Sequence, residues 1–189
     1  MSVLPIVTYD DEVLRKEAKP VEENTPEIQQ LIDNMFDTMY NSDGVGLAAP
    51  QIGELHRIFV ADAGPLTEEE GGRKYGPLAL INPKITFESE EKVDMEEGCL
   101  SIPGVNASVT RPEKIVVNYL DRDFNKQELE VDGWLARVIQ HETDHLDGIL
   151  FLDHLSMFKR KLLSSKLKKI DEGSAEIDYP IVPKKQKAK

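Results

Sequence analysis

Apolar residues recur at helical spacing between residues 26 and 42. Thr25 and Pro26 open this stretch and are typical of the N-cap and the first position of a helix. A helix with 3.6 residues per turn brings the repeated apolar positions onto one face. These positions are Ile28, Leu31, Ile32, Met35, Phe36 and Met39. The pattern predicts an amphipathic helix that packs against the core and ends near Ser42.

Two more helices are predicted in the second half of the chain. Asp132 can cap a helix that runs to a stop at Gly148. Ser156 can cap a last helix whose apolar positions are Phe158, Leu162, Leu163, Leu167 and Ile170. From residue 171 onward we expect mostly irregular chain, with a short strand at 177–182.

Short apolar segments between turn residues predict strands. The expected strands are 58–60, 78–81, 85–88, 115–119 and 129–131, with a hairpin turn at 123–125. The first 20 residues are expected to be irregular or extended, and residues 63–76 to form a surface loop. The small, glycine-rich run at 44–53 indicates backbone that must approach another group closely.

Together these elements predict an α+β fold, with antiparallel β-sheets around a central helix and a C-terminal helix. We expect one catalytic domain over residues 1–170 and a tail over 171–189. The chain has 189 residues, which is enough for one domain with a substantial core.

The net charge of −12 argues against a duplex DNA-binding protein, which needs a basic face. No apolar run approaches the ~20 residues that span a bilayer, and the first residues lack the basic start of a signal peptide. Cys99 is the single cysteine, so it cannot form an intramolecular disulfide. A reducing, cytoplasmic location without membrane contact is therefore expected.

The candidate chemistry lies in the run His-Glu-Thr-Asp-His at 141–145. On a helix, His141 and His145 fall one turn apart on one face, where both imidazoles can bind one metal ion. Glu142 is rotated by about 100° from His141, so it is poorly placed as a ligand on that face. It is well placed to take a proton from a water at the metal.

The third ligand is less clear from this run alone. Metallopeptidases with the longest version of the motif have a third His where this chain has Phe151. His154 lies beyond the expected helix stop, and Glu172, the first glutamate downstream, lies in the tail. Cys99 is a further candidate because a thiolate is a good metal ligand, although many single cysteines are only buried apolar residues.

Three segments carry a resemblance to a known family. Gly-Val-Gly-Leu-Ala-Ala-Pro-Gln (44–51), Glu-Gly-Cys-Leu-Ser (97–101) and Gln-His-Glu-Thr-Asp-His-Leu (140–146) resemble the three signature motifs of bacterial-type peptide deformylases, in the family's order. The resemblance extends from about residue 6 to residue 155. It implies a hydrolase that removes the formyl group from N-formylmethionyl nascent polypeptides and releases formate.

The resemblance also implies roles for individual residues. The implied metal ligands are Cys99, His141 and His145. Glu142 is the implied general base, and the Gln51 amide and the Leu100 N–H are the implied donors to the oxyanion. The implied substrate-binding residues are Val45, Gly46, Gly98, Trp134 and Val138, of which Val45, Trp134 and Val138 could equally be plain core residues. Glu97 and Arg111 are expected to pair and to brace the Cys99 loop, and Asp144 is expected to face away from the metal.

By resemblance the metal is one divalent ion, Fe(II), for which Zn, Ni or Co can substitute. The last helix and the tail gather lysines and arginines in an otherwise acidic chain. A solvated amphipathic helix is the simpler explanation of this asymmetry, and ribosome docking is the sharper one by analogy with bacterial deformylases.

Two other functions remain compatible with the helix motif. One is a metallopeptidase, which the absent downstream ligand disfavours. The other is a non-catalytic, metal-stabilised binding module, in which a fourth protein ligand closes the site and Glu142 is dispensable. His154 is the candidate for that fourth ligand.

Overall fold

The computed structural model describes residues 2–64 and 76–182, which form two sheets and three α-helices. The helices are α1 (Pro26–Asn41), α3 (Gly133–Leu146) and α4 (Met157–Asp171). The strands are β1 (Gly46–Ala48), β2 (Ile58–Ala61), β3 (Leu78–Glu88), β4 (Lys92–Glu97), β5 (Ala107–Pro112), β6 (Lys114–Leu120) and β7 (Lys126–Asp132). Short 3₁₀ turns occur at Glu12–Arg15, Ala49–Ile52 and Phe151–His154.

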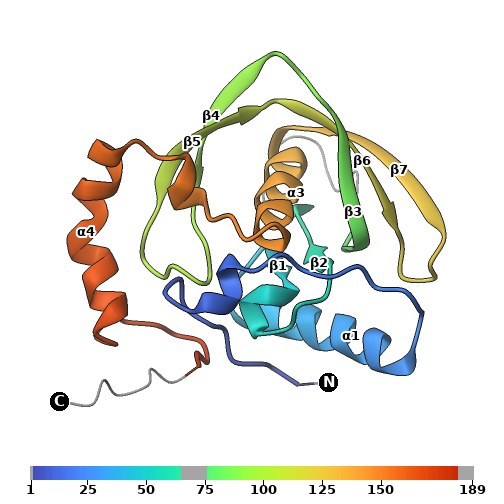
Figure 1. The fold of residues 1–189 in the computed structure, drawn as a ribbon, viewed down its shortest axis with the longest axis horizontal. Helices are drawn as coiled ribbons and strands as arrows, with labels where there is room; N and C mark the ends of the chain where they lie inside the picture. The colour runs from blue at the N-terminus through green and yellow to red at the C-terminus, as the bar shows by residue number, and fades with distance from the viewer. Residues whose placement is uncertain (1, 65–75, 183–189) are drawn as a thin grey trace.

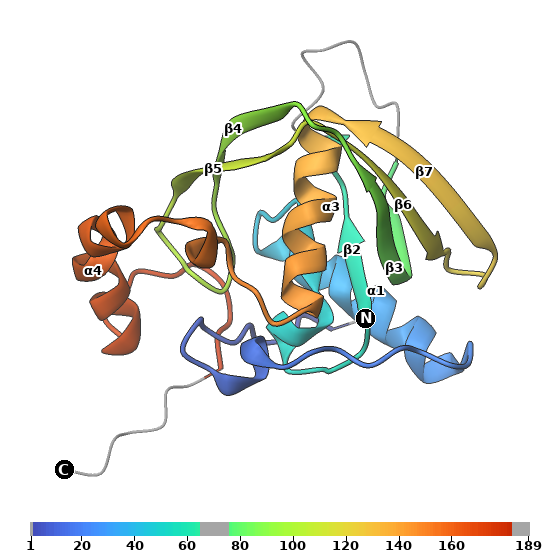
Figure 2. The ribbon, with the colours of Figure 1, turned by 45° about the horizontal axis from the view of Figure 1, so that its top comes forward.

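All named strand pairs are antiparallel. Five strands form one sheet in the order β1-β2-β3-β6-β7, and β4 pairs with β5 in a second, two-stranded sheet. Only three residues separate β3 from β4 and one separates β5 from β6, so the two sheets continue into each other as a bent ribbon. Figures 1 and 2 show this ribbon curving around α3.

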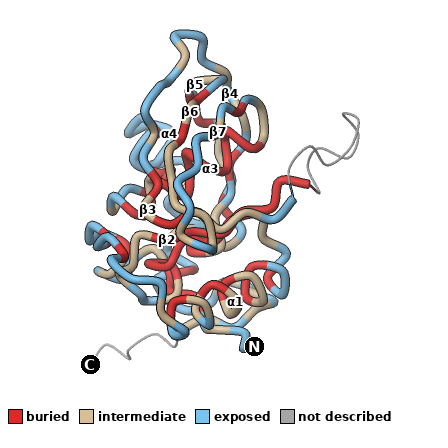
Figure 3. The backbone as a smooth tube through the Cα atoms, turned by 90° about the vertical axis from the view of Figure 1, so that its right-hand side faces the viewer, coloured by how far each residue is buried: buried red, intermediate tan, exposed pale blue. Residues whose placement is uncertain are grey.

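Helix α3 is the centre of the molecule. Nearly all of its residues are buried, including polar ones such as Arg137 and Glu142. Its apolar side packs against the large sheet, where Leu135 and Ile139 meet Phe59 and Val117 in one buried cluster. Figure 3 shows the buried residues gathered on α3 and the strands beside it, with exposed residues at the periphery. Polar side chains on α3 are therefore largely shielded from solvent and need partners within the protein.

The predicted fold class and the three helices are confirmed. Thr25 and Ser156 accept hydrogen bonds from Ile28 N and Lys159 N, so both predicted side-chain caps form. Helix α4 lies at one edge of the molecule (Figure 1) and turns only Leu163, Leu167 and Ile170 toward the core. Among residues 2–64 and 76–182, no helix is both long and apolar enough to cross a bilayer.

Several predicted strand boundaries were wrong. Segments 78–81 and 85–88 belong to one strand, β3, which bends at Asn82, where φ is +51° and the register with β6 shifts. The tail forms an isolated bridge between Ile181 and Ile6 in place of the strand expected at 177–182. The first 20 residues contain the 3₁₀ turn already named. The loop expected at 63–76 lies mostly outside the described residues.

Strands β1, β4 and β5 were not predicted. The β4 sequence Lys-Val-Asp-Met-Glu-Glu carries four charged residues, and its outward side chains are exposed. β4 pairs with β5 along its whole length, from Lys92–Pro112 to Glu97–Ala107. This long-range pairing, rather than local propensity, makes it a strand.

Candidate active site

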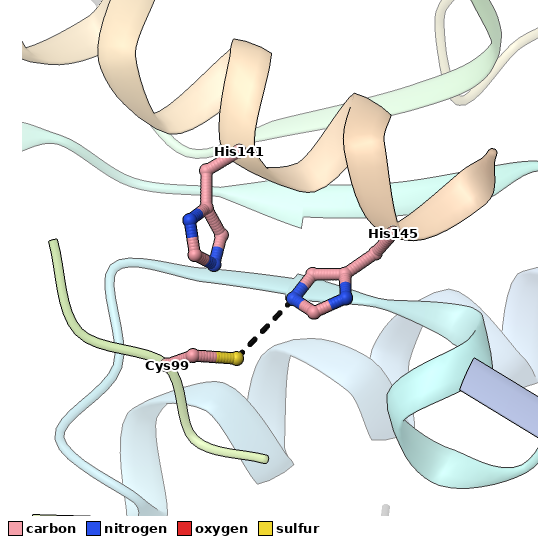
Figure 4. A group of neighbouring side chains, drawn as sticks. All are labelled: Cys99, His141 and His145. Atoms are coloured by element: carbon pink, nitrogen blue, oxygen red, sulfur yellow. Dashed lines mark hydrogen bonds between the residues drawn. The ribbon is translucent and has the colours of Figure 1, made fainter. Parts of the chain in front are cut away.

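Three of the predicted site residues bring their ligand atoms together. The ligand atoms of Cys99, His141 and His145 all lie within 4.8 Å of one another, and Cys99 Sγ is 3.2 Å from His145 Nε2. Figure 4 shows both imidazoles extending from α3 toward the thiol. Among the described residues this is the one group of His, Cys, Asp and Glu side chains with such convergence.

Two segments that are distant in the sequence contribute to this group. His141 and His145 are one turn apart on α3, and their rings meet edge to face with centroids 5.0 Å apart. Cys99 follows the end of β4 in a turn closed by a hydrogen bond from Ile102 N to Cys99 O, 2.8 Å long. The chain thus delivers the thiol to the histidines from the opposite side.

Glu97 orients His141 through the ring nitrogen that faces away from Cys99. His141 Nδ1 lies 2.9 Å from Glu97 Oε2, which leaves the other ring nitrogen facing Cys99 and His145 (Figure 4). Arg111 and Arg137 also bind the Glu97 carboxylate, at 2.7 Å and 2.8 Å. Burial opposes the ionised form, but the hydrogen bonds from His141 and Arg111 outweigh it and lower the pKa of Glu97. The expected Glu97–Arg111 pair is confirmed.

The two histidines differ in their surroundings. Burial lowers the pKa of His145 well below its usual value, which favours the neutral imidazole that binds a metal ion. Burial also works against a charged His141, but hydrogen bonds with Cys99 and Glu97 raise its pKa. His145 Nδ1 is buried with no hydrogen-bond partner among the described residues. Only His141 is oriented by a carboxylate.

Glu142 is buried beside the ligand group. Burial is the largest cause that raises the pKa of Glu142, to about 7. Its Oε2 is buried and has no hydrogen-bond partner among the described residues. A carboxylate of this pKa can both accept and return a proton near neutral pH.

Gln51 and Leu100 flank the thiol. Gln51 Nε2 lies 3.5 Å from Cys99 Sγ and 3.4 Å from Ser101 Oγ. The Gln51 Oε1 accepts a hydrogen bond from Ala48 N at 2.8 Å, which directs the amide nitrogen toward the site. Gln51 is 1% exposed, so it is not a surface amide.

A pocket of about 290 Å³ opens beside this group. Every predicted site residue lines it except His145, which is 1% exposed. Its walls include Val45, Gly46, Gly98, Trp134 and Val138.

Sequence reasoning missed three lining residues, Asp43, Glu96 and Arg137. Arg137 is buried one turn before His141 and binds Val109 O and Val93 O, both at 2.8 Å, as well as Glu97. The i, i+4 spacing from Arg137 to His141 could have revealed it.

His154 and Asp144 lie on the far side of α3. His154 Nε2 is 2.7 Å from Asp144 Oδ2, and Asp144 also binds Arg111 at 2.7 Å. His154 is not among the converging ligand atoms. Asp144 faces away from them as expected, and the candidate fourth ligand of a closed metal site is engaged elsewhere.

The donor set fits a metal ion. One thiolate and two imidazole nitrogens are the ligand types that bind zinc, iron and related divalent ions. Three protein ligands beside an open pocket are typical of a catalytic rather than a structural site.

Comparison with known proteins agrees with this geometry. A family model described as polypeptide deformylase matches residues 3–161. The chain belongs to the polypeptide deformylase family. This membership confirms the predicted family and the predicted hydrolase function.

Individual relatives of this deformylase cover nearly its whole length. A peptide deformylase from Salinibacter ruber is 52% identical over 186 residues, which is 96% of this chain and 95% of the relative. The crystal structure of peptide deformylase from Ehrlichia chaffeensis superposes with a TM-score of 0.83 at 45% identity, covering 91% of this chain and 98% of that one. A second Ehrlichia chaffeensis structure, in complex with actinonin, has the same TM-score and identity and covers 93% and 100% of the two chains.

Gly46 packs directly against Glu142, and this contact makes a testable prediction. A Cβ added at Gly46 would overlap the Glu142 carboxylate, since Cγ and Cδ of Glu142 lie only 2.9 Å away. We expect Gly46→Ala to lower kcat for a formylated peptide by about ten- to a hundred-fold, because it would displace the carboxylate that is predicted to act as the general base. Steady-state kinetics at matched metal content tests this.

Gly76→Ala is the matched control, since a Cβ there meets no atom within 4 Å. Full activity in Gly46→Ala would show that Glu142 does not need its observed position.

Proposed function

We propose that this deformylase removes the N-terminal formyl group of nascent polypeptides at one metal ion held by Cys99, His141 and His145. The observation that carries the proposal is the convergence of these three ligand atoms beside a pocket lined by the buried Glu142 carboxylate, whose Oε2 has no hydrogen-bond partner among the described residues. A divalent ion held by these residues would act as a Lewis acid toward water and the formyl oxygen.

Glu142 moves the proton in this proposal. It accepts a proton from the attacking water and delivers it to the amine that leaves as the C–N bond breaks. Its burial supports this role, because an environment that raises the pKa of Glu142 to about 7 favours both transfers. The products are formate and a peptide with a free N-terminus.

Gln51 and Leu100 stabilise the developing oxyanion. The Gln51 amide is buried and fixed by Ala48 N, and Leu100 follows the metal-binding Cys99 directly in the chain. Preorganised donors of this kind need no reorientation during the reaction.

The pocket accepts the methionine side chain and the edge of β1 accepts the substrate backbone. Val45, Trp134 and Val138 give the pocket apolar walls. β1 is the edge strand of its sheet and pairs only with β2 among the described strands, so the Gly46 backbone can pair with an extended peptide. Gly98 also lines the pocket, so its backbone can contact that peptide. Recognition through main-chain groups suits a substrate whose later residues vary.

We infer Fe(II) as the physiological metal, with Zn, Ni or Co as substitutes. The mixed sulfur and nitrogen donors accept all of these ions. Iron beside a thiolate also makes the enzyme sensitive to oxygen, whereas a zinc enzyme is not.

One assay tests the function. Protein loaded anaerobically with Fe(II) or Ni(II) is incubated with formyl-Met-Ala-Ser, and formate and free amine are measured. We expect the two products in equal amounts. Cleavage at an internal peptide bond would instead identify a metallopeptidase, and no turnover with any metal would identify a binding module.

We further propose that α4 docks on ribosomal RNA, which places the enzyme in the cytoplasm beside emerging chains. Helix α4 carries one acidic residue, Asp171, and six basic residues: Lys159, Arg160, Lys161, Lys166, Lys168 and Lys169. This cluster contrasts with the net charge of −12 for the whole chain. A basic face on an acidic protein suits a phosphate backbone.

Charge reversal on α4 tests the docking. We expect Lys161→Glu with Lys166→Glu to weaken co-sedimentation with ribosomes by about ten-fold or more and to reduce its dependence on salt, because contacts with phosphate are lost. Reversal is a cleaner test than deletion, since Leu163, Leu167 and Ile170 of α4 pack on the core. Lys84→Glu with Lys126→Glu, two exposed strand residues, is the control. Equal weakening by both pairs would contradict docking through α4.

A further inference from the structure

Three consecutive carbonyls in the Cys99 loop each accept a hydrogen bond from a different segment. Cys99 O accepts from Ile102 N at 2.8 Å, within the loop itself. Ser101 O accepts from Tyr9 N at 2.9 Å, in the N-terminal segment. Leu100 O, between them, accepts from the hydroxyl of Tyr179 at 2.7 Å. The C-terminal segment therefore contacts the loop that carries a metal ligand and an oxyanion donor.

Tyr179 is held firmly in this position. Tyr179 and Leu100 both pack against the apolar cluster that includes Ile32 and Met35 of α1. Pro180 and Val182, which follow Tyr179, are hydrogen-bonded to the N-terminal segment. Ile6 N donates to Pro180 O and Val182 N donates to Ile6 O, both at 2.9 Å. Burial and the neighbouring charges of Cys99 and Asp178 raise the pKa of Tyr179, so its hydroxyl remains protonated and can donate.

The same segment is linked to the other proposed oxyanion donor. Val7, which follows Ile6, donates its N–H to the backbone carbonyl of Gln51 at 2.8 Å. Residues 6–7 therefore connect the backbone of Gln51 to residues 180–182, which directly follow Tyr179. None of residues 179–182 lies in the stretch that the family model matches, which ends at residue 161.

We propose that Tyr179 is a positioning residue for deformylation, which holds the Cys99–Ser101 loop in its catalytic geometry through the Leu100 carbonyl. The proposal rests on the function proposed above. The carbonyl of Leu100 and its N–H belong to adjacent peptide planes that share the Leu100 Cα. Fixing the second plane at its carbonyl restricts rotation about that Cα, and so restricts the direction in which the N–H points.

Tyr179→Phe tests this role because it removes one oxygen and leaves the packed ring. With full-length protein at equal metal content, we expect kcat for formyl-Met-Ala-Ser to fall about three- to ten-fold, the range that one net hydrogen bond supports. KM should stay within about two-fold, since the pocket walls do not change. Tyr119→Phe, on β6 and away from this pocket, is the matched control and should retain the wild-type kcat.

A second measurement separates positioning from general stability. Co(II)-loaded protein has thiolate-to-metal absorption that reports the geometry of the Cys99 sulfur, and we expect Tyr179→Phe to shift this band while Tyr119→Phe does not. A wild-type kcat and an unshifted band in Tyr179→Phe would overturn the proposal, as would a lower kcat that simply follows lost metal. Failure of the wild-type protein to release formate would contradict the proposed function instead, and the Co(II) band would still decide whether Tyr179 positions the loop.

Discussion

Replacing Glu142 with glutamine is expected to lower the rate of formate release by about a hundred- to ten-thousand-fold, the usual contribution of a general base. Glutamine has nearly the same shape but cannot accept the proton of the attacking water. The three ligand side chains are untouched, so bound metal should remain at the wild-type level. The measurement is kcat for formyl-Met-Ala-Ser together with metal content by atomic absorption.

Glu128→Gln provides the control for this substitution. Glu128 is exposed on β7, away from the pocket that contains Glu142. It should show wild-type activity. A Glu142→Gln protein that keeps both its metal and its activity would remove Glu142 from the mechanism and favour a binding module.

Replacing Cys99 with alanine is expected to abolish turnover through loss of the metal. Two imidazoles remain, but the third donor is gone, and we expect metal affinity to fall by more than the ten- to hundred-fold cost of altering residues that merely support a ligand. Equilibrium competition with a metal chelator measures this affinity directly.

His154→Ala is the informative comparison for Cys99→Ala. His154 binds Asp144 on the far side of α3 and contributes no atom to the ligand group. We expect its substitution to leave metal affinity within a few-fold of wild type. A large loss of metal from His154→Ala with none from Cys99→Ala would assign the site to different residues.

The parts of the fold that the sequence predicted are those with local signals. Helix α1 follows from its apolar spacing and from Thr25 and Pro26 at its start. The position of His141 and His145 on one face of α3 follows from their spacing alone. The thiol made Cys99 a candidate ligand, but only the resemblance to a family singled it out, because nothing near it in the sequence reveals that β4 ends beside α3.

The parts that were missed depend on contacts between distant segments. β4 is rich in charged residues and becomes a strand only through its pairing with β5. The close packing of Gly46 on Glu142 joins residues that lie far apart in the chain. Tyr179 lay in the short strand expected at 177–182, and its contact with the Cys99 loop was not predicted, since its partner, Leu100 O, is a backbone atom that no sequence pattern marks.

The rate of formate release as a function of bound metal is the most direct test of chemistry at a Cys99–His141–His145 centre. Apoprotein is titrated anaerobically with Fe(II), and formate from formyl-Met-Ala-Ser is measured at each metal content. We predict no activity without metal and a linear rise that reaches its plateau at one ion per chain. Formate release by metal-free protein, or none at one bound ion per chain, would contradict this centre.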